Sequence, residues 1–219
     1  MGHFYSIATM IKWDTFIIAN ILTSASAIGV AADTGKLLWK YEHRVKYDVN
    51  IVTPIYTDGH VLLFATLARG ATMLKLNVDG DTCEVEEVWR TEELDNEHGG
   101  VVLVDGYLYG HADGNHKWRH WACLELNTGK TMYSVEGLSV TRSAALTYAD
   151  GMLYLLSDRG DVALVPATPD GFNIVSQFQL PKGGKGPAWA HPVVLNGRFY
   201  LRYGQFIYAY DVSLASVTD

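Results

Sequence analysis

The residues best suited to chemistry in this chain include three histidines in one short stretch, HADGNHKWRHW at 111–121. His111, His116 and His120 have the spacing H-x4-H-x3-H. Imidazole nitrogens are common zinc ligands, but this spacing fits no standard zinc motif and shows no supporting shell of partners. We therefore expect a long surface loop between two strands of a hairpin, with a metal site at these three histidines as the alternative.

A second set of polar and aromatic residues recurs at intervals in the mid-forties, each time just before an apolar stretch. Its members are Thr53, His98, Arg142, Ser143, Trp189 and His191. If the fold brings these positions together, a ligand or metal would find donors at His98 and His191, and Arg142 would attract an anion. The alternative is a polar funnel filled with water.

Signatures of a catalytic site are missing from the sequence. There is no Gly-x-Ser-x-Gly elbow, and Cys83 and Cys123 stand alone without a CxxC pair. The stretch PKGGKGP at 181–187 is rich in glycine and basic. A phosphate cradle would need a strand before it and a helix after it, so we interpret this stretch as a connection.

Composition excludes some classes of function. The 219 residues are 48% hydrophobic and carry a formal net charge of −7, which favours a globular chain and disfavours binding to a nucleic-acid backbone. No stretch is long and apolar enough for a membrane-spanning helix. The apolar segment 16–32 has some features of a signal peptide, but it runs directly into the Asp33-Thr34-Gly35 turn, so cleavage would cut a structural unit.

The elements that must position these residues are short strands in a repeat. Four Asp-Gly or Asn-Gly pairs each join two runs rich in strand-forming residues, and their glycines are Gly59, Gly106, Gly151 and Gly197. The separations are 47, 45 and 46 residues. Such pairs favour the type I′ turn of a β-hairpin. Each hairpin is followed by a third strand, a second turn and a fourth strand. Gly35 and Gly80 mark this second turn in two successive units and are 45 residues apart.

Four short strands in a period of about 45 residues predict an all-β fold, a β-propeller of four-stranded antiparallel blades. We place about five modules, within one propeller domain spanning residues 1–219, at 4–41, 49–90, 97–136, 142–179 and 189–213. Each module must stack on its neighbours to bury its faces. The aromatic residues after the outer turns are expected to pack between blades, and they are Trp39, Trp89, Tyr133 and Phe178.

The stretches GVAADTGKLLW (29–39) and CLELNTGKTMY (123–133) resemble the repeat of pyrroloquinoline-quinone (PQQ)-type propellers, Ala-x-Asp-x-x-Thr-Gly-Lys-x-x-Trp. Thr34, Gly35, Lys36 and Trp39 match the pattern in the first unit. The resemblance covers nearly the whole chain, but Gly29 and Ala31 stand where the pattern has Ala and Asp. It is specific for the fold and says little about activity.

The resemblance implies two functions. The family includes non-catalytic propellers, such as the outer-membrane assembly lipoprotein, so one is a scaffold that binds a protein or small ligand without a cofactor. The other is a fragment or relative of a quinoprotein alcohol dehydrogenase with PQQ and calcium. That chemistry needs an adjacent cysteine pair or a calcium-binding carboxylate and Asn set, and neither is recognisable. Relatives are usually extracytoplasmic, so the resemblance implies a periplasmic, bacterial protein.

The last module shows only three strands, because SLASVTD at 213–219 is short and polar. The chain is then either part of a larger ring of 7–8 blades, or a five-bladed ring or open arc closed by a partner chain. In both interpretations, open blade edges would favour self-association unless they are covered.

Overall fold

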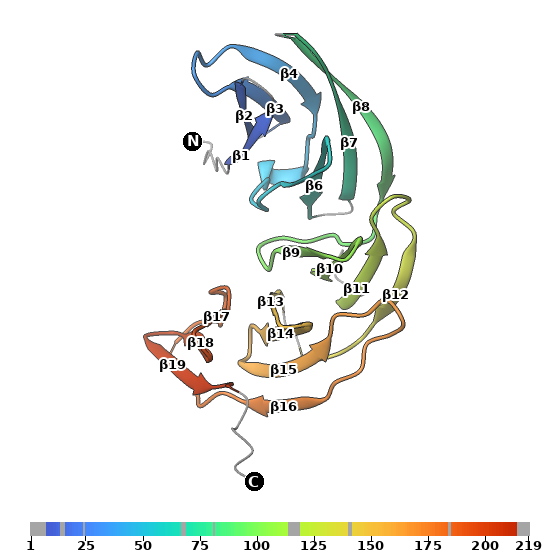
Figure 1. Cartoon of the computed structure of the whole chain (residues 1–219). Helices are drawn as coiled ribbons and strands as arrows, with labels where there is room; N and C mark the ends of the chain where they lie inside the picture. Colours follow the sequence, from blue (N-terminus) through green and yellow to red (C-terminus); the bar gives the residue numbers. More distant parts are fainter. Residues whose placement is uncertain are drawn as a thin grey trace. The chain divides into compact units, whose positions relative to one another are not determined.

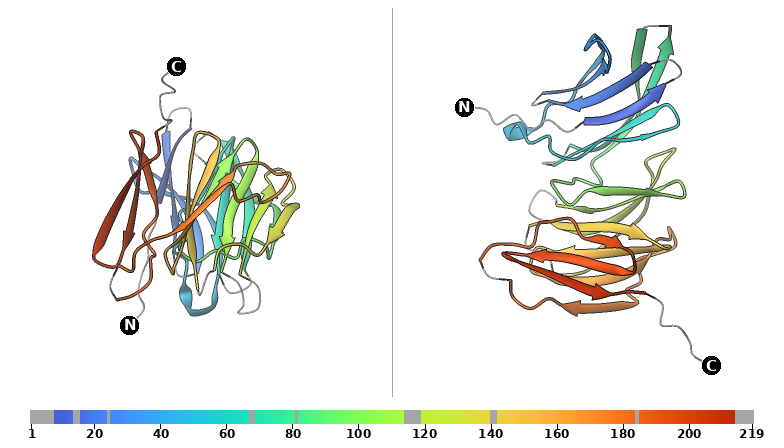
Figure 2. Two further views of the ribbon diagram at one scale, coloured as in Figure 1. Left: turned by 90° about the horizontal axis from the view of Figure 1, so that it is seen from below. Right: turned by 60° about the vertical axis from the view of Figure 1, so that its left-hand side comes forward.

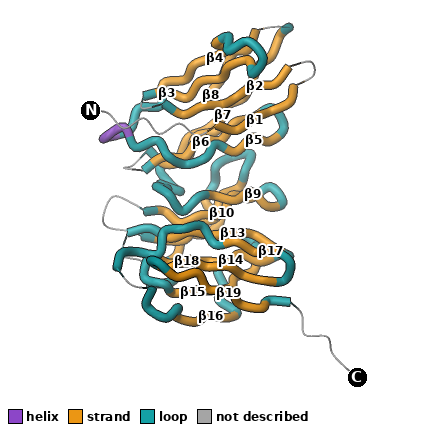
Figure 3. Tube along the Cα trace, turned by 90° about the vertical axis from the view of Figure 1, so that its left-hand side faces the viewer, coloured by secondary structure: helices purple, strands orange, loops and turns teal. Residues whose placement is uncertain are grey.

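The computed structural model describes residues 8–13, 16–23, 25–66, 69–80, 82–113, 119–139, 142–183 and 185–213. Within these ranges the chain consists of β-strands and their connections, with one short 3-10 helix at Lys46–Asp48, purple in Figure 3. The expected all-β fold of antiparallel blades is confirmed.

The chain divides into two compact units. The first comprises residues 1–97, 112–118 and 126–130, and the second comprises residues 98–111, 119–125 and 131–219. In both units the strands of each sheet are hydrogen-bonded in chain order, which is the arrangement of a propeller blade (Figure 1).

The first unit holds two four-stranded sheets. Blade 1 consists of β1 (Ala8–Trp13), β2 (Phe16–Leu22), β3 (Ser26–Ala31) and β4 (Leu37–Glu42). Blade 2 consists of β5 (Ile55–Thr57), β6 (His60–Ala65), β7 (Gly70–Asp79) and β8 (Thr82–Thr91). The segment 16–32, which has features of a signal peptide, forms two neighbouring strands of blade 1.

The second unit holds two four-stranded sheets and one of three strands among the described residues. Blade 3 consists of β9 (Val101–Val104), β10 (Tyr107–Ala112), β11 (His120–Glu125) and β12 (Thr131–Val135). Blade 4 consists of β13 (Ala144–Ala149), β14 (Met152–Ser157), β15 (Asp161–Pro166) and β16 (Ser176–Gln179). Blade 5 consists of β17 (Val193–Leu195), β18 (Arg198–Tyr203) and β19 (Phe206–Asp211).

The hairpin turns have the geometry that their sequences predict. The first residue of each turn has a positive φ, with values of 43°, 47°, 50° and 50° at Asp58, Asp105, Asp150 and Asn196. The φ of the glycine that follows is also positive in each turn. Two successive positive φ values define a type I′ turn, whose twist matches that of the strands it joins. These four turns fix the register of the first hairpin in blades 2 to 5.

The core of the first unit lies between its two sheets. Trp39, on β4, is buried in one cluster with Val61, Leu63 and Leu74 of blade 2. Gly29, on the neighbouring strand β3, has no side chain, and a Cβ there would overlap the Trp39 indole. The glycine therefore makes room for the ring whose burial joins the two blades, and burying such a side chain stabilises a fold by roughly 2–3 kcal/mol.

In the second unit, strand β14 of blade 4 is buried on both faces. Leu153 and Leu155 of β14 pack in a cluster with Tyr109 of blade 3, whereas the alternate residue Leu156 packs with Phe199 of blade 5. This two-residue alternation is what a strand between two sheets requires. Figure 2 shows the strands of blade 5, in red, lying against the orange strands of blade 4.

The aromatic residues after the outer turns pack as expected. Trp89 donates its indole N–H to the carbonyl of Leu126 at 2.9 Å, and its ring lies against Gly129. Tyr133 packs against Phe172, and Phe178 packs against Tyr210. These packing contacts explain why aromatic residues follow the outer turns.

Candidate functional site

Four of the predicted site residues come together in the second unit. The rings of His98 and Trp189 meet edge to face, with centroids 4.5 Å apart. The Nε2 atom of His191 forms a hydrogen bond of 2.7 Å with the carbonyl of His98. His98, Ser143 and Trp189 are among the residues that line a crevice, which is too narrow to hold a water molecule. The two histidines therefore hold the Trp189 indole and the backbone in place.

Two glycines after His98 allow this close approach. A Cβ on Gly99 would overlap the carbonyl oxygen of Ala144, at the start of blade 4. Gly100 has a φ of 76°, and a Cβ there would lie 2.8 Å from Cε1 of His191. The two glycines thus allow two close contacts, one between two backbone segments and one between the backbone and the His191 imidazole ring.

Arg142 and Ser143 lie in a tight connection into blade 4. The carboxylate of Asp158 accepts a hydrogen bond of 2.9 Å from the Arg142 amide, and the Asp158 amide donates to the Ser143 carbonyl at 3.2 Å. Ser143 is buried and the Arg142 side chain is exposed. Thr53 belongs to the first unit, where its side chain is exposed, and it is not a member of this group.

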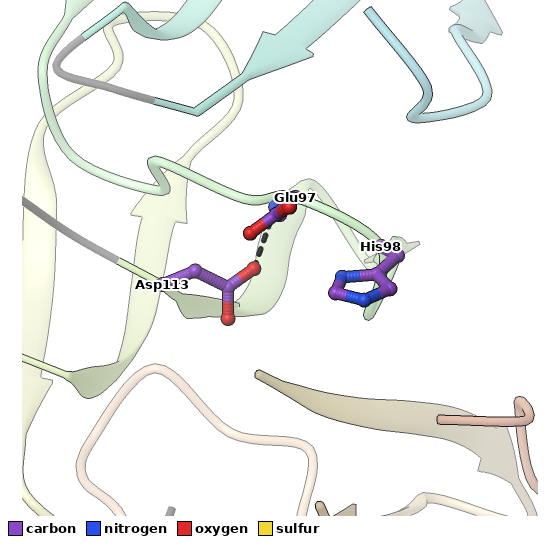
Figure 4. Close-up of side chains that lie close together, drawn as sticks. All are labelled: Glu97, His98 and Asp113. Carbon is purple, nitrogen blue, oxygen red and sulfur yellow. Dashed lines mark hydrogen bonds between the residues drawn. The ribbon is translucent and has the colours of Figure 1, made fainter. Parts of the chain in front are cut away.

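The same kind of clamp occurs in the first unit, 45 residues earlier. The Asp113 carboxylate accepts a hydrogen bond of 2.6 Å from the Glu97 amide, drawn in Figure 4 with His98, which follows Glu97 in the chain. Asp113 and Asp158 each come directly after the second strand of a blade. These aspartates were not among the predicted site residues, although their equivalent positions in HADG and SDRG are visible in the sequence.

Next to Trp189 the second unit has an open cavity of about 450 Å³. It is lined by Lys185, Gly186, Pro187, Trp189, Ala190, Arg202, Gly204 and Gln205. One wall is the loop before blade 5, and the other is the end of β18 with the turn that follows it. The stretch 181–187, interpreted above as a connection, therefore contributes to a cavity without any helix.

The loop that forms this cavity is attached at both of its ends. The Ala188 amide donates to the carbonyl of Asp158 at 2.9 Å, and the Gln205 amide donates to the carbonyl of Gly183 at 3.2 Å. A Cβ on Gly183 would overlap the carbonyl of Tyr203, so only glycine allows the loop to lie this close to β18. These contacts give the cavity a defined shape.

The charge in the cavity is positive. Lys185 and Arg202 are its charged lining residues, and no acidic side chain of the described residues lines it. Arg202 donates through Nε to the carbonyl of Gly204 at 3.2 Å, which orients its guanidinium group. The cavity is thus locally positive, although the chain has a net charge of −7.

The histidines of 111–121 are only partly described. His111 is buried on β10, and its ring meets Trp121 edge to face at 5.0 Å between centroids. His120 begins β11 and is half-buried, whereas His116 lies outside the described residues. The described residues bring no set of three ligands together around His111 or His120.

The two thiols are buried and separate. Cys83 belongs to the core cluster of the first unit and Cys123 to that of the second. Burial raises the pKa of each thiol to about 11, so both are protonated near neutral pH. They do not fit the adjacent cysteine pair that quinoprotein chemistry uses.

Comparison with known proteins identifies the fold. No family model and no curated protein matches the chain. Among solved structures, the computationally designed Ika8 protein is similar with a TM-score of 0.64 at 12% identity, covering 94% of this chain and 58% of its own. Saccharomyces cerevisiae Sqt1 gives a TM-score of 0.64 at 13% identity, covering 90% of this chain and 57% of its own.

BamB from Moraxella catarrhalis gives a TM-score of 0.45 at 18% identity, covering 91% of this chain and 70% of its own. Ika8 and Sqt1, with the higher TM-scores, are β-propellers, so the predicted fold class is supported. The chain spans a little under three-fifths of the length of Ika8 and Sqt1. In the part of the chain that the structure describes, no helix has the length and apolar character needed to cross a membrane.

Proposed function

We propose that this chain is a non-catalytic propeller scaffold that binds a ligand or a protein through the loops around Trp189. The observation that carries the proposal is what the predicted site residues contact. His98 and His191 hold an indole ring and a backbone carbonyl, directly beside an open cavity. Concave sites with an aromatic wall and a few polar groups are the usual form of binding sites.

The chemistry of the described residues supports binding over catalysis. A nucleophile needs a low pKa or an adjacent base, but both thiols are buried with a raised pKa. Ser143 is buried, and its hydroxyl has no hydrogen-bond partner among the described residues, so no described base activates it. In this proposal the recognition of a partner is the function, and the blades position the loops.

The PQQ-type resemblance also motivates two finer proposals. We infer that the repeats are of the PQQ-like kind found in non-catalytic members of that family, and that the protein acts outside the cytoplasm, as those relatives do. The second inference predicts that the full-length protein is recovered in the periplasmic fraction of its bacterial host. Recovery in the cytoplasmic fraction alone would contradict it.

The proposed function is tested by adding PQQ and calcium to the purified chain and measuring dye reduction with a panel of alcohols. We expect background rates of dye reduction with every alcohol in the panel. Alcohol-dependent turnover that requires PQQ would overturn the proposal and favour a quinoprotein dehydrogenase. The His98→Gln and His191→Gln variants serve as controls, because neither should change the background rate.

A further inference from the structure

We propose that the cavity between Lys185, Arg202 and Trp189 binds a small organic anion that carries a flat ring. This inference deepens the proposed binding function and rests on it. The cavity volume of about 450 Å³ lies in the range of sites for small ligands.

The charged group of the ligand follows from the two cations. Lys185 lies on the loop before blade 5 and Arg202 on β18, so the two cations reach the cavity from different segments of the chain. No described acidic side chain lines the cavity to neutralise them. A guanidinium and an ammonium group facing one cavity favour a carboxylate or a phosphate.

The flat ring follows from Trp189. Its side chain is 39% exposed, although its ring packs edge to face with that of His98. An indole that is held in place but accessible offers its surface to a planar group at little cost in side-chain entropy. The Gln205 side chain, on the same cavity, adds a donor and an acceptor for polar groups of the ligand.

The cavity is formed before any ligand arrives. Gly183 lets the loop approach β18, Gly204 has a φ of 60° in the turn after β18, and hydrogen bonds from the amides of Ala188 and Gln205 hold the loop in place. A site that needs no rearrangement loses little binding free energy to ordering. This distinguishes the cavity from a chance concentration of surface lysines and arginines.

Two sources of ligand share this chemistry, namely nucleotides and aromatic carboxylates. Calorimetry on the full chain would use adenosine 5′-monophosphate for the first and indole-3-acetate for the second. Adenosine lacks the charge and inorganic phosphate lacks the ring, so both should bind at least about tenfold more weakly than the better of the two probes. The better probe identifies the source.

Variants test the residues. Arg202→Gln and Lys185→Gln should each weaken the better probe about tenfold, and the effect should shrink at high salt. The matched controls are Arg198→Gln, which is exposed on the same strand, and Lys182→Gln, on the same loop, and both lie outside the cavity lining. Trp189→Ala should weaken binding and Trp189→Phe should largely preserve it, with thermal melting showing that both variants are folded.

The proposal would be overturned if neither probe bound. It would also be overturned if the control variants lost as much affinity as Arg202→Gln and Lys185→Gln. Failure of the proposed function and failure of this inference are distinguishable, because quinone-dependent turnover contradicts the scaffold function and says nothing about this cavity. Absence of binding here removes the anion site and leaves the scaffold function in place.

Discussion

Two histidines, His43 in the first unit and His191 in the second, show how burial decides what a polar residue does. His43 follows β4, its side chain is fully buried, and neither ring nitrogen has a hydrogen-bond partner among the described residues. His191 precedes β17, its side chain is exposed, and its Nε2 bonds to a backbone carbonyl. The same residue type is therefore part of the interior in one unit and part of the candidate site in the other.

The surroundings of His43 explain its role. The side-chain amide of Asn50 donates to the carbonyls of Thr23 and His43 at 2.8 and 2.9 Å, and so ties together the connections of blade 1. Burial, with the nearby Arg69 charge, lowers the pKa of His43 to about 4. The first unit thus keeps the neutral imidazole of His43 inside, whereas the rings of His98 and His191 in the second unit lie beside Trp189, which lines an open cavity.

The largest expected effect concerns the pH dependence of His43. Its pKa is about 4 in the fold, against an ordinary value of 6.5. The unfolded chain therefore binds more protons between these pH values, and the fold loses stability as the pH falls through this window. The total loss is about 3 kcal/mol. Urea denaturation of the native chain and of His43→Gln at several pH values would measure the difference.

The control for this prediction comes from the second unit. His191→Gln should keep the native pH dependence, because the buried His43 is still present. If His43→Gln retained the same pH dependence as the native chain, the contrast between the two histidines would be wrong.

The next effect compares two glycines that make room for close contacts. Gly99→Ala, in the second unit, should cost about 3 kcal/mol, because the added methyl group meets the backbone carbonyl of Ala144. Gly29→Ala, in the first unit, should cost about 2 kcal/mol, because it meets the Trp39 side chain, which can turn.

Gly106→Ala is the reference for these two variants. Nothing lies within 4 Å of a Cβ there, so only its positive φ is strained, at about 1 kcal/mol. Denaturation midpoints of the three variants give the ranking. A Gly99→Ala chain no less stable than Gly106→Ala would refute the close backbone contact beside His98.

The smallest effect compares the two aspartate clamps. Asp158→Ala in the second unit and Asp113→Ala in the first should each cost about 1 kcal/mol, because an amide loses its acceptor. Asp158→Asn and Asp113→Asn keep an oxygen at the same place and should lose less. Thermal melting of the four variants tests whether both units rely on the same clamp, and losses confined to one unit would show that they do not.

The blades could be predicted because their information is local. The pairs Asp58-Gly59, Asp105-Gly106, Asp150-Gly151 and Asn196-Gly197 specify their turns within two residues, and both residues of each pair have the positive φ that such a turn requires. The division into two units was not visible in the sequence, because it depends on contacts between distant segments.

The candidate site could be predicted only in part. The repeat spacing placed His98, Ser143, Trp189 and His191 at equivalent blade starts, and the structure brings them together. Lys185 and Arg202 were missed as a pair, because their proximity depends on Gly183 lying against Tyr203, which no periodic pattern encodes. Their binding role, like that of the other site residues, stays a prediction until it is measured.

Blade 5 has a consequence for amide hydrogen exchange. The third strands β3, β7, β11 and β15 are paired on both sides, whereas β19 is paired only with β18 in the part of the chain that is described. Its Ile207 is 73% exposed. Alternate amides of β19 therefore face solvent and should take up deuterium far faster than their neighbours, so protection along this strand would report directly when another segment completes the blade.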